Sequence, residues 1–266
     1  MANILDSIIA NKRREVEAMA RLGGEIPAAV SSRPTVSMKQ ALTDSPTGII
    51  AEFKRRSPSK GEIHPLALPS DVIPAYEKAG ATACSVLTDT VYFGGALTDL
   101  AQARCRASLP LLRKDFIVDR RQIAEARFYG ADAILLIAAA LTRPEVEDLT
   151  GYAHSLGLEV LFEIHNAAEL DRFTPEVDMV GVNNRDLRTF ATDPQLSATV
   201  ARELPDGVVK VAESGLSTMN EVRQLREAGF RGFLIGETFM RNADPGKALS
   251  EVLKSKTSNR LFKNKS

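Results

Sequence analysis

The sequence has few cysteines and histidines and no net charge, and each shortage excludes a class of protein. Its two cysteines, Cys84 and Cys105, are too few for a disulfide framework or a zinc site of cysteine pairs, and we expect both to be buried in apolar surroundings. The 34 basic residues balance the 34 acidic ones, which argues against a surface that coats nucleic acid. The three histidines do not have the spacing of metal ligands, so we expect no metal site.

Long hydrophobic runs are also absent. No apolar stretch is long enough to span a bilayer. The first residues do not resemble a signal peptide, because Asp6 interrupts their apolar part and the basic cluster follows it. Ile4, Leu5, Ile8 and Ile9 instead recur at helical spacing and predict an amphipathic helix. We therefore expect no membrane partner, and the two cysteines without a disulfide framework fit a reducing, cytoplasmic setting.

What the sequence does contain is a repeated pattern of short apolar runs. Their starts lie roughly 20–35 residues apart, the spacing of βα units. Helical patterns separate them, and three of these patterns end in a glycine before the next run, at Gly80, Gly130 and Gly229. The eight predicted strands are 48–53, 83–87, 110–114, 132–137, 158–163, 178–183, 207–212 and 232–236.

Near-continuous apolar strands such as AILLI (133–137) are typical of a parallel sheet that is covered on both faces. Eight of them predict an α/β protein, a single (β/α)8 TIM barrel. A doubly wound sheet is the alternative, but its glycine-rich GxGxxG turn is absent. We expect residues 1–266 to form one domain: a helical extension at 1–47, the barrel at 48–253 and a solvated basic tail at 254–266.

Charged residues gather at the carboxyl ends of the predicted strands, which in a barrel meet at one rim. In a strand, residues i and i+2 share a face, so Glu52 and Lys54 point the same way. By the same parity Phe53, Arg113 and Phe162 face away from the barrel axis. The residues predicted to share one pocket are Glu52, Lys54, Lys114, Glu163 and Glu213.

The loops after the last two strands, AESGLST and IGETFM, suit a phosphate group. Their small residues let backbone N–H groups approach an anion, and a helix follows. We assign Gly215, Gly236 and the backbone amide of Glu237 to this site, with the hydroxyl of Ser57 as a further donor.

Other patterns are weaker. The segment SPSK (57–60) matches a serine-nucleophile motif but lacks its companion motifs, so we interpret it as a loop. His165 follows Glu163 at a strand end, but we do not assign it to the pocket. Glu52 and Glu163 could suggest a glycosidase pair. The two lysines argue against this, because they favour ionised glutamates over a neutral acid.

Taken together, the strand-end segments resemble those of the indole-3-glycerol-phosphate synthase family, and the resemblance extends from the first helix to about residue 250. The segments that carry it are, in order, IIAEFKRRSPSKG, SVLTDTVYFGG, LLRKDFIVDRRQI, GADAILLIAA, LFEIHNAAEL, GVNNRDLRTF, VAESGLST and FLIGETFMR.

The resemblance implies a barrel with a helical extension over its mouth and a step in tryptophan biosynthesis without a cofactor. The substrate would be 1-(2-carboxyphenylamino)-1-deoxyribulose 5-phosphate. The products would be indole-3-glycerol phosphate, CO2 and water.

It also implies roles for residues. Lys114 matches the family's general acid and Glu163 its general base. Lys54 matches a second lysine, which holds the substrate carboxylate or acts as acid in dehydration. The remaining matches are Glu52 and Glu213 in the charge network, Asn183 and Ser214 as hydrogen-bonding partners of the substrate, Arg185 in support, and Ser57, Gly215, Gly236 and Glu237 at the phosphate.

Two rival readings stay open at this point. One is another phosphate-binding barrel such as phosphoribosylanthranilate isomerase, which would need a cysteine and an aspartate as base and acid. The other is a barrel that binds a ligand without catalysis. We expect a small phosphorylated partner, no nucleic acid and a monomer.

Overall fold

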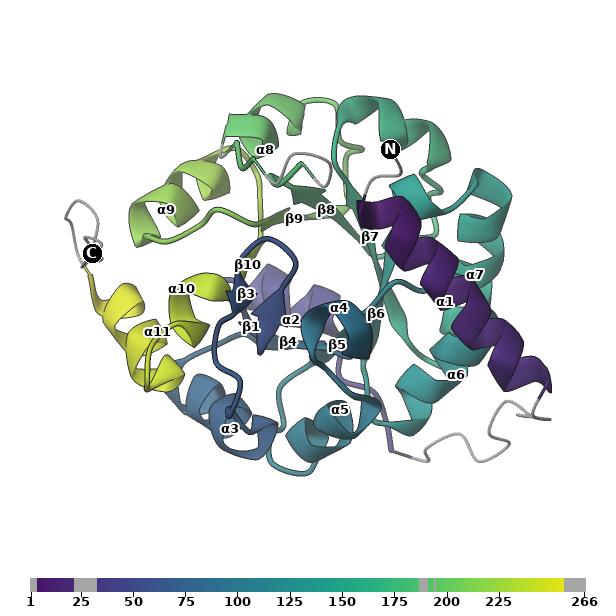
Figure 1. Cartoon of the computed structure of the whole chain (residues 1–266). Coiled ribbons are helices and arrows are strands. Elements are labelled where there is room, and N and C mark those ends of the chain that lie inside the picture. Colours follow the sequence, from purple (N-terminus) through teal and green to yellow (C-terminus); the bar gives the residue numbers. More distant parts are fainter. Residues whose placement is uncertain (1–3, 22–32, 187–190, 194, 256–266) are drawn as a thin grey trace.

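The computed structural model describes residues 4–21, 33–186, 191–193 and 195–255. Eight strands, each parallel to its neighbours, close into a barrel in which β1 pairs with both β4 and β10 (Figure 1). Each overlaps one of the predicted runs, so the predicted (β/α)8 barrel is confirmed. The strands are β1 (Ile49–Phe53), β4 (Ala83–Leu87), β5 (Leu111–Lys114), β6 (Ala133–Ile137), β7 (Glu159–Ile164), β8 (Met179–Asn183), β9 (Val209–Glu213) and β10 (Gly232–Ile235).

Helices surround the barrel and connect successive strands (Figure 1). Thr142 and Glu145 form a capping box at the start of α7 (Arg143–Ser155), where the Glu145 carboxylate accepts the backbone amide of Thr142. The segment after β7 is the 3₁₀ helix η2 (Ala167–Arg172), and η1 (Ala138–Ala140) follows β6. The other surrounding helices are α3 (Pro69–Ala79), α5 (Leu97–Arg104), α6 (Arg120–Phe128), α8 (Gln195–Val200), α9 (Met219–Glu227) and α11 (Pro245–Lys254).

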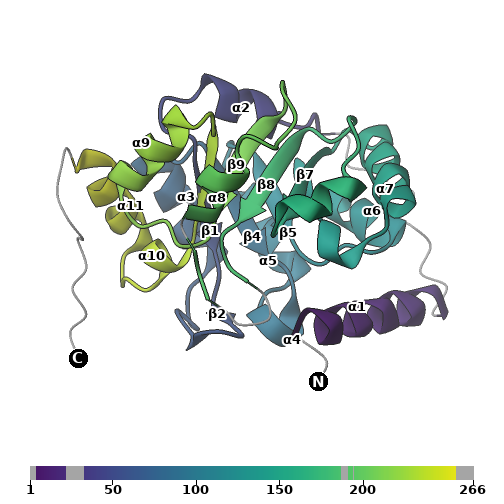
Figure 2. The same cartoon turned by 90° about the horizontal axis from the view of Figure 1, so that it is seen from above.

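The chain before β1 covers both ends of the barrel. Helices α1 (Ile4–Arg21) and α2 (Met38–Asp44) lie at opposite ends (Figure 2). The end that carries α1 also carries the β2–β3 hairpin (Arg56–Ser57 with Gly61–Glu62) and the short helix α4 (Thr90–Phe93). This is the carboxyl end of the strands, where active sites of this fold lie.

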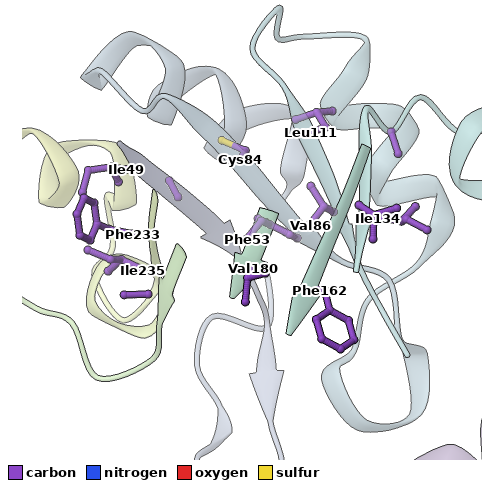
Figure 3. Packing of buried hydrophobic residues seen from close by; sticks show 14 of the residues in the cluster. Ile49, Phe53, Cys84, Val86, Leu111, Ile134, Phe162, Val180, Phe233 and Ile235 are labelled. Carbon is purple, nitrogen blue, oxygen red and sulfur yellow. The ribbon is translucent and has the colours of Figure 1, made fainter. Parts of the chain in front are cut away.

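Two layers of apolar side chains make up the core. The outer layer packs the barrel against its helices and includes Phe53, Phe162 and Phe233 (Figure 3). The inner layer fills the barrel with alternate strand residues such as Leu112, Leu161 and Val211. The alternation of side chains along each strand thus separates the two layers. The inward-facing side chains at the carboxyl ends of the strands therefore face into the mouth of the barrel.

The expectations about the cysteines, the membrane, the basic tail and the domain limits have different outcomes. Cys84 is buried as predicted, but Cys105 is exposed, because it follows α5 at the edge of the helical ring. Among the described helices, none combines the length and hydropathy that a membrane crossing requires. Most of the predicted basic tail, residues 256–266, lies outside the described residues. The domain limits stay a prediction.

Candidate active site

All the residues predicted for the site line one cavity at the mouth of the barrel, with a volume of about 380 Å³. They come from the carboxyl ends of β1, β5, β7, β8, β9 and β10 or from the loops that follow them. They are Glu52, Lys54, Ser57, Lys114, Glu163, Asn183, Arg185, Glu213, Ser214, Gly215, Gly236 and Glu237.

Lys114 stands among carboxylates at the end of β5. Its Nζ lies 3.2 Å from Oε2 of Glu163 and 3.6 Å from Oε2 of Glu213. Burial alone lowers the pKa of Lys114, but the negative charges of Glu163 and Glu213 outweigh burial, and the net pKa lies above its ordinary value. Lys114 is therefore a charged ammonium near neutral pH, as an acid that donates a proton must be.

Glu163 is almost fully buried and is kept ionised by the groups around it. Burial raises the pKa of its carboxyl group, but Lys114 and His165 outweigh this and hold the net pKa well below the ordinary value. Asn183 also donates a hydrogen bond to Oε1 of Glu163, at 3.2 Å. Glu163 thus has the unprotonated form that a base requires.

His165 is a residue that was not assigned to the site from the sequence. It lies behind Glu163, with Nε2 3.3 Å from Oε1 of Glu163 and Nδ1 3.5 Å from Oε2 of Glu169. Burial lowers the pKa of His165, but its contacts with both carboxylates raise the net pKa to about 10. The only signal in the sequence was its position, two residues after Glu163 and four before Glu169, because i and i+2 of a strand share a face.

Glu213 does not fit the expectation that the lysines keep every glutamate ionised. Burial and the nearby charge of Glu163 raise its pKa to about 8, although Lys114 opposes the shift. One ammonium cannot fully compensate two buried carboxylates, so near neutral pH Glu163 is ionised and Glu213 holds a proton. Its side chain lies against Gly181 of β8, where an added Cβ would be 2.2 Å from Oε1.

Glu52 and Lys54 form a second ion pair in the same cavity. Nζ of Lys54 lies 2.5 Å from Oε1 of Glu52, and the carboxylate is buried. Gly236 is needed here for space, because a Cβ at that position would lie 2.4 Å from Oε1 of Glu52. The glycine assigned from the sequence to the phosphate site therefore also makes room for a glutamate.

The loops after β9 and β10 form the polar end of the cavity. Ser214 and Gly215 have φ angles of 66° and 77°, and for Ser214 this is an unfavourable backbone conformation of the kind found at functional sites. Just before the helix that follows, α9, the Glu221 carboxylate accepts the backbone amides of Ser217 and Thr218, so these two amides are already hydrogen-bonded. The assignment of a phosphate to these two loops stays a prediction.

The carboxylate of Glu237 lies among cations beside this end. Its oxygens are 3.6 Å from Arg185, 3.7 Å from Lys60 and 3.4 Å from Arg241. Arg185 also donates a 2.5 Å hydrogen bond to the hydroxyl of Ser59 in the hairpin loop. The positive groups at this end are therefore tied to Glu237 and to the loop after β1.

One wall of the cavity is apolar, and it was not predicted from the sequence. Its residues come from α1, α4, β6 and the loop after β5, and they are Ile4, Leu5, Ile8, Phe93, Phe116, Leu135 and Ile137. The cavity is thus divided into an apolar wall, a charged floor and a polar end. Within the described ranges no group of three or more His, Cys, Asp or Glu residues is arranged to hold a metal ion.

The His165 contacts predict how stability depends on pH. A pKa raised from about 6.5 to about 10 means that the folded protein binds this proton more strongly than the unfolded chain. The stabilisation is complete below about pH 6.5 and is lost as the pH rises toward 10. We expect His165→Asn to reduce this pH dependence of the free energy of unfolding, measured by urea titration from pH 6 to 10.

The exposed His154 provides the matched control for this measurement, because its substitution by Asn removes a histidine from the surface of α7. An unchanged slope in the His165→Asn variant would show that His165 is not charged in the folded protein.

Comparisons with known proteins agree with this geometry. The family profile described as "Indole-3-glycerol phosphate synthase" matches residues 5–252. The chain is 51% identical to an indole-3-glycerol phosphate synthase of Bacteroides thetaiotaomicron over 261 residues, which are 96% of this chain and 99% of that protein.

Solved structures show the same fold at low identity. The N-acetylmannosamine-6-phosphate 2-epimerase of Clostridium perfringens is similar with a TM-score of 0.59 and 14% identity, covering 80% of this chain and 95% of that one. A mutant tryptophan synthase alpha-subunit of Pyrococcus furiosus has a TM-score of 0.57 and 16% identity, covering 78% and 98%. The match of the family profile along nearly the whole length and the identity to the Bacteroides enzyme show that this chain belongs to the indole-3-glycerol phosphate synthase family.

Proposed function

We propose that this cavity carries out the family's reaction, the ring closure of 1-(2-carboxyphenylamino)-1-deoxyribulose 5-phosphate to indole-3-glycerol phosphate with loss of CO2 and water. The observation that carries the proposal is the position of Lys114 between Glu163 and Glu213, with an apolar wall on one side and small-residue loops on the other. The apolar wall suits an aromatic ring, Lys114 suits a reacting ketone, and the small-residue loops suit a phosphate.

Ring closure needs an acid. The electron-rich ring carbon attacks the ketone carbon, and the ketone oxygen gains negative charge that a nearby donor must neutralise. Lys114 supplies this proton. Loss of CO2 then returns an electron pair to the ring. In the last step the hydroxyl leaves as water while Glu163 accepts the proton that the indole ring loses.

The remaining residues bind and orient the substrate. Lys54, held by Glu52, either pairs with the substrate carboxylate or protonates the departing hydroxyl. Asn183 and Ser214 donate hydrogen bonds to the substrate, and Glu213 lies beside Lys114 as a neutral carboxyl group near neutral pH. The phosphate is bound by Ser57, Gly215, Gly236 and the backbone amide of Glu237, with Arg185 in support.

The rival barrel reaction does not fit this cavity. Phosphoribosylanthranilate isomerase chemistry would need a cysteine as base, and no cysteine is among the described residues that line the cavity. We further propose that the protein acts as a monomer in the cytoplasm.

The direct test is to incubate the purified protein with the carboxyphenylamino substrate and follow the fluorescence of the indole product. We expect turnover without added metal or cofactor. Consumption of phosphoribosylanthranilate instead, or binding of the substrate without product, would contradict the proposal.

The raised pKa of Glu213 predicts the shape of the pH profile. Above about pH 8 Glu213 ionises, and a second negative charge beside Lys114 makes the ammonium a weaker acid. We therefore expect kcat of the wild type to fall above pH 8. Glu213→Gln has a similar shape but no charge, so its kcat, whatever its absolute size, should stay level across this range.

The comparison uses kcat measured from pH 6 to 10 in both proteins. If kcat of Glu213→Gln also fell near pH 8, the fall would be caused by the ionisation of another group.

A further inference from the structure

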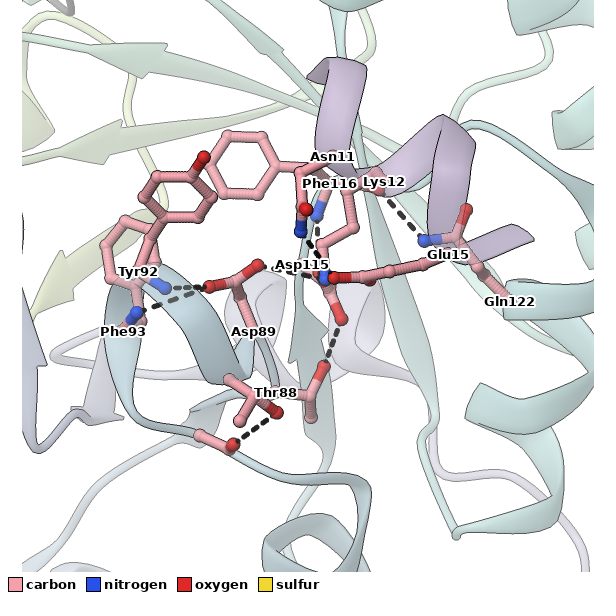
Figure 4. A network of polar contacts seen from close by, with 12 residues as sticks. Asn11, Lys12, Glu15, Thr88, Asp89, Tyr92, Phe93, Asp115, Phe116 and Gln122 are labelled. Carbon is pink, nitrogen blue, oxygen red and sulfur yellow. Dashed lines mark hydrogen bonds and ion pairs between the residues drawn. The ribbon is translucent and has the colours of Figure 1, made fainter. Parts of the chain in front are cut away.

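We propose that Lys12 is a positioning residue of this active site, which couples helix α1 to the two loops that hold the apolar wall of the cavity. The inference rests on the proposed function, and it adds a residue from outside the barrel to the groups that determine how the aromatic part of the substrate is bound. Figure 4 shows Lys12 and its partners.

Lys12 is unusual on its helix. The buried residues of α1 are Leu5, Ile8, Lys12 and Val16, so a lysine occupies one position of an otherwise apolar stripe. Only 4% of Lys12 is exposed. Its Nζ lies 2.9 Å from Oδ2 of Asp89, 3.1 Å from Oδ1 of Asp115 and 3.0 Å from Oε2 of Glu15. We call these four residues the Lys12 cluster.

The first aspartate holds the loop after β4. Asp89 is fully buried, and its Oδ1 accepts the backbone amides of Tyr92 and Phe93 at 2.6 and 3.2 Å, which caps α4. Its Oδ2 accepts no hydrogen bond in the described part of the chain and lies against Lys12. Lys12 therefore neutralises the carboxylate that fixes Phe93 at the cavity wall.

The second aspartate holds the loop after β5. Asp115 directly follows Lys114, and its Oδ1 accepts the backbone amide of Phe116 at 2.8 Å. Its Oδ2 accepts from Thr88 at 2.6 Å and from Arg113 at 3.0 Å. The rings of Phe93 and Phe116 lie 6.0 Å apart, so the two loops meet as one aromatic wall.

The same face of α1 adds Leu5 and Ile8 to that wall. One buried ammonium thus connects three separate segments, each of which supplies apolar side chains to the cavity. Burial lowers the pKa of Lys12, but the negative charges of Asp115 and Asp89 outweigh burial. The net pKa therefore lies above its ordinary value, and Lys12 stays charged. Breaking a buried ion pair by removing one partner leaves an uncompensated charge, which is strongly unfavourable.

The test compares Lys12→Met with Arg13→Met, because the neighbouring Arg13 makes only a half-exposed ion pair with Glu145, at 3.6 Å. Two inhibitors probe the two ends of the cavity: 2-aminobenzoate for the apolar wall and inorganic phosphate for the polar end. In Lys12→Met we expect KM for the substrate and Ki for 2-aminobenzoate to rise about tenfold, roughly 1.4 kcal/mol, while Ki for phosphate stays unchanged. Arg13→Met should change none of these values.

An equal rise of Ki for 2-aminobenzoate and for phosphate would show that the whole cavity had become less ordered. Unchanged Ki values for both probes would show that Lys12 only attaches α1 to the barrel. Either result would overturn the proposal. If Lys12→Met does not fold, Asp89→Asn replaces it, because the amide oxygen can still cap α4 while the charge pairing is lost. Lys12→Arg, which keeps the charge, should recover part of the 2-aminobenzoate affinity. Turnover by the wild type is measured first, so that failure of the proposed function is recognised separately.

Discussion

Replacing Lys114 by alanine is expected to lower kcat by about 10² or more, the usual scale for the loss of a general acid. Its ammonium is the only side-chain cation within ion-pair distance of both Glu163 and Glu213 among the described residues. Without it no positioned donor neutralises the ketone oxygen as the ring closes. The carboxylates can take up a proton in its absence, so the fold should survive the change. Initial rates of indole product formation at saturating substrate give kcat directly.

Two further variants make this result specific. Lys114→Met keeps the unbranched stem but removes the charge, so it should be as inactive as the alanine variant. Lys210→Met is the matched control, because Lys210 also lies on a barrel strand but donates to the carbonyl of Ala201, away from the cavity. A Lys114→Ala enzyme that turns over at nearly the wild-type rate would refute the role of Lys114 as acid.

The barrel could be predicted because the signals for it are local and repeated. A run such as Ala133–Ile137 is apolar on both faces, which only a covered parallel strand requires. Positive-φ glycines such as Gly80 and Gly130 do follow helices, as the sequence indicated. Strand parity then placed Lys114 and Glu163 on the inner face without knowledge of any contact.

The apolar wall could not be predicted in the same way. Its residues come from α1, α4, β6 and the loop after β5, and only the tertiary fold brings these segments together. The sequence showed that α1 is amphipathic. It did not show that Lys12, which interrupts the apolar stripe, forms ion pairs with Asp89 and Asp115. Long-range ion pairs of this kind have no periodicity that a single sequence displays.

Electrostatics explains the remaining differences. The sequence shows how many charges meet at the rim, but the protonation of each depends on distances. Glu163 and Glu213 share one ammonium, yet of the two only Glu163 pairs with His165 and accepts a hydrogen bond from the Asn183 side chain among the described residues. Their pKa values therefore separate, with Glu163 below its usual range and Glu213 raised to about 8. Two carboxyl groups with different environments can then take different parts in one reaction.

Replacing Glu163 by glutamine is expected to leave substrate binding largely intact and to stall the reaction, with a fall in kcat on the order of 10²–10⁴. The amide keeps the size of the side chain and its oxygen can still accept from Asn183 or Lys114, which now lie 3.2 Å from the two carboxylate oxygens. The amide cannot take the proton that the ring loses during dehydration. Single-turnover experiments should therefore show bound substrate that is converted slowly.

The control for this variant is Glu159→Gln, at the opposite end of the same strand, where the carboxylate accepts from Ser37 and the amide of Lys39. That change should affect stability but not turnover. If Glu163→Gln instead raised KM while kcat stayed at the wild-type value, Glu163 would contribute equally to ground-state and transition-state binding. The base would then be another group of the cavity. Glu213 is the nearest candidate, and because its pKa is raised to about 8, turnover would then increase as the pH rises toward 8.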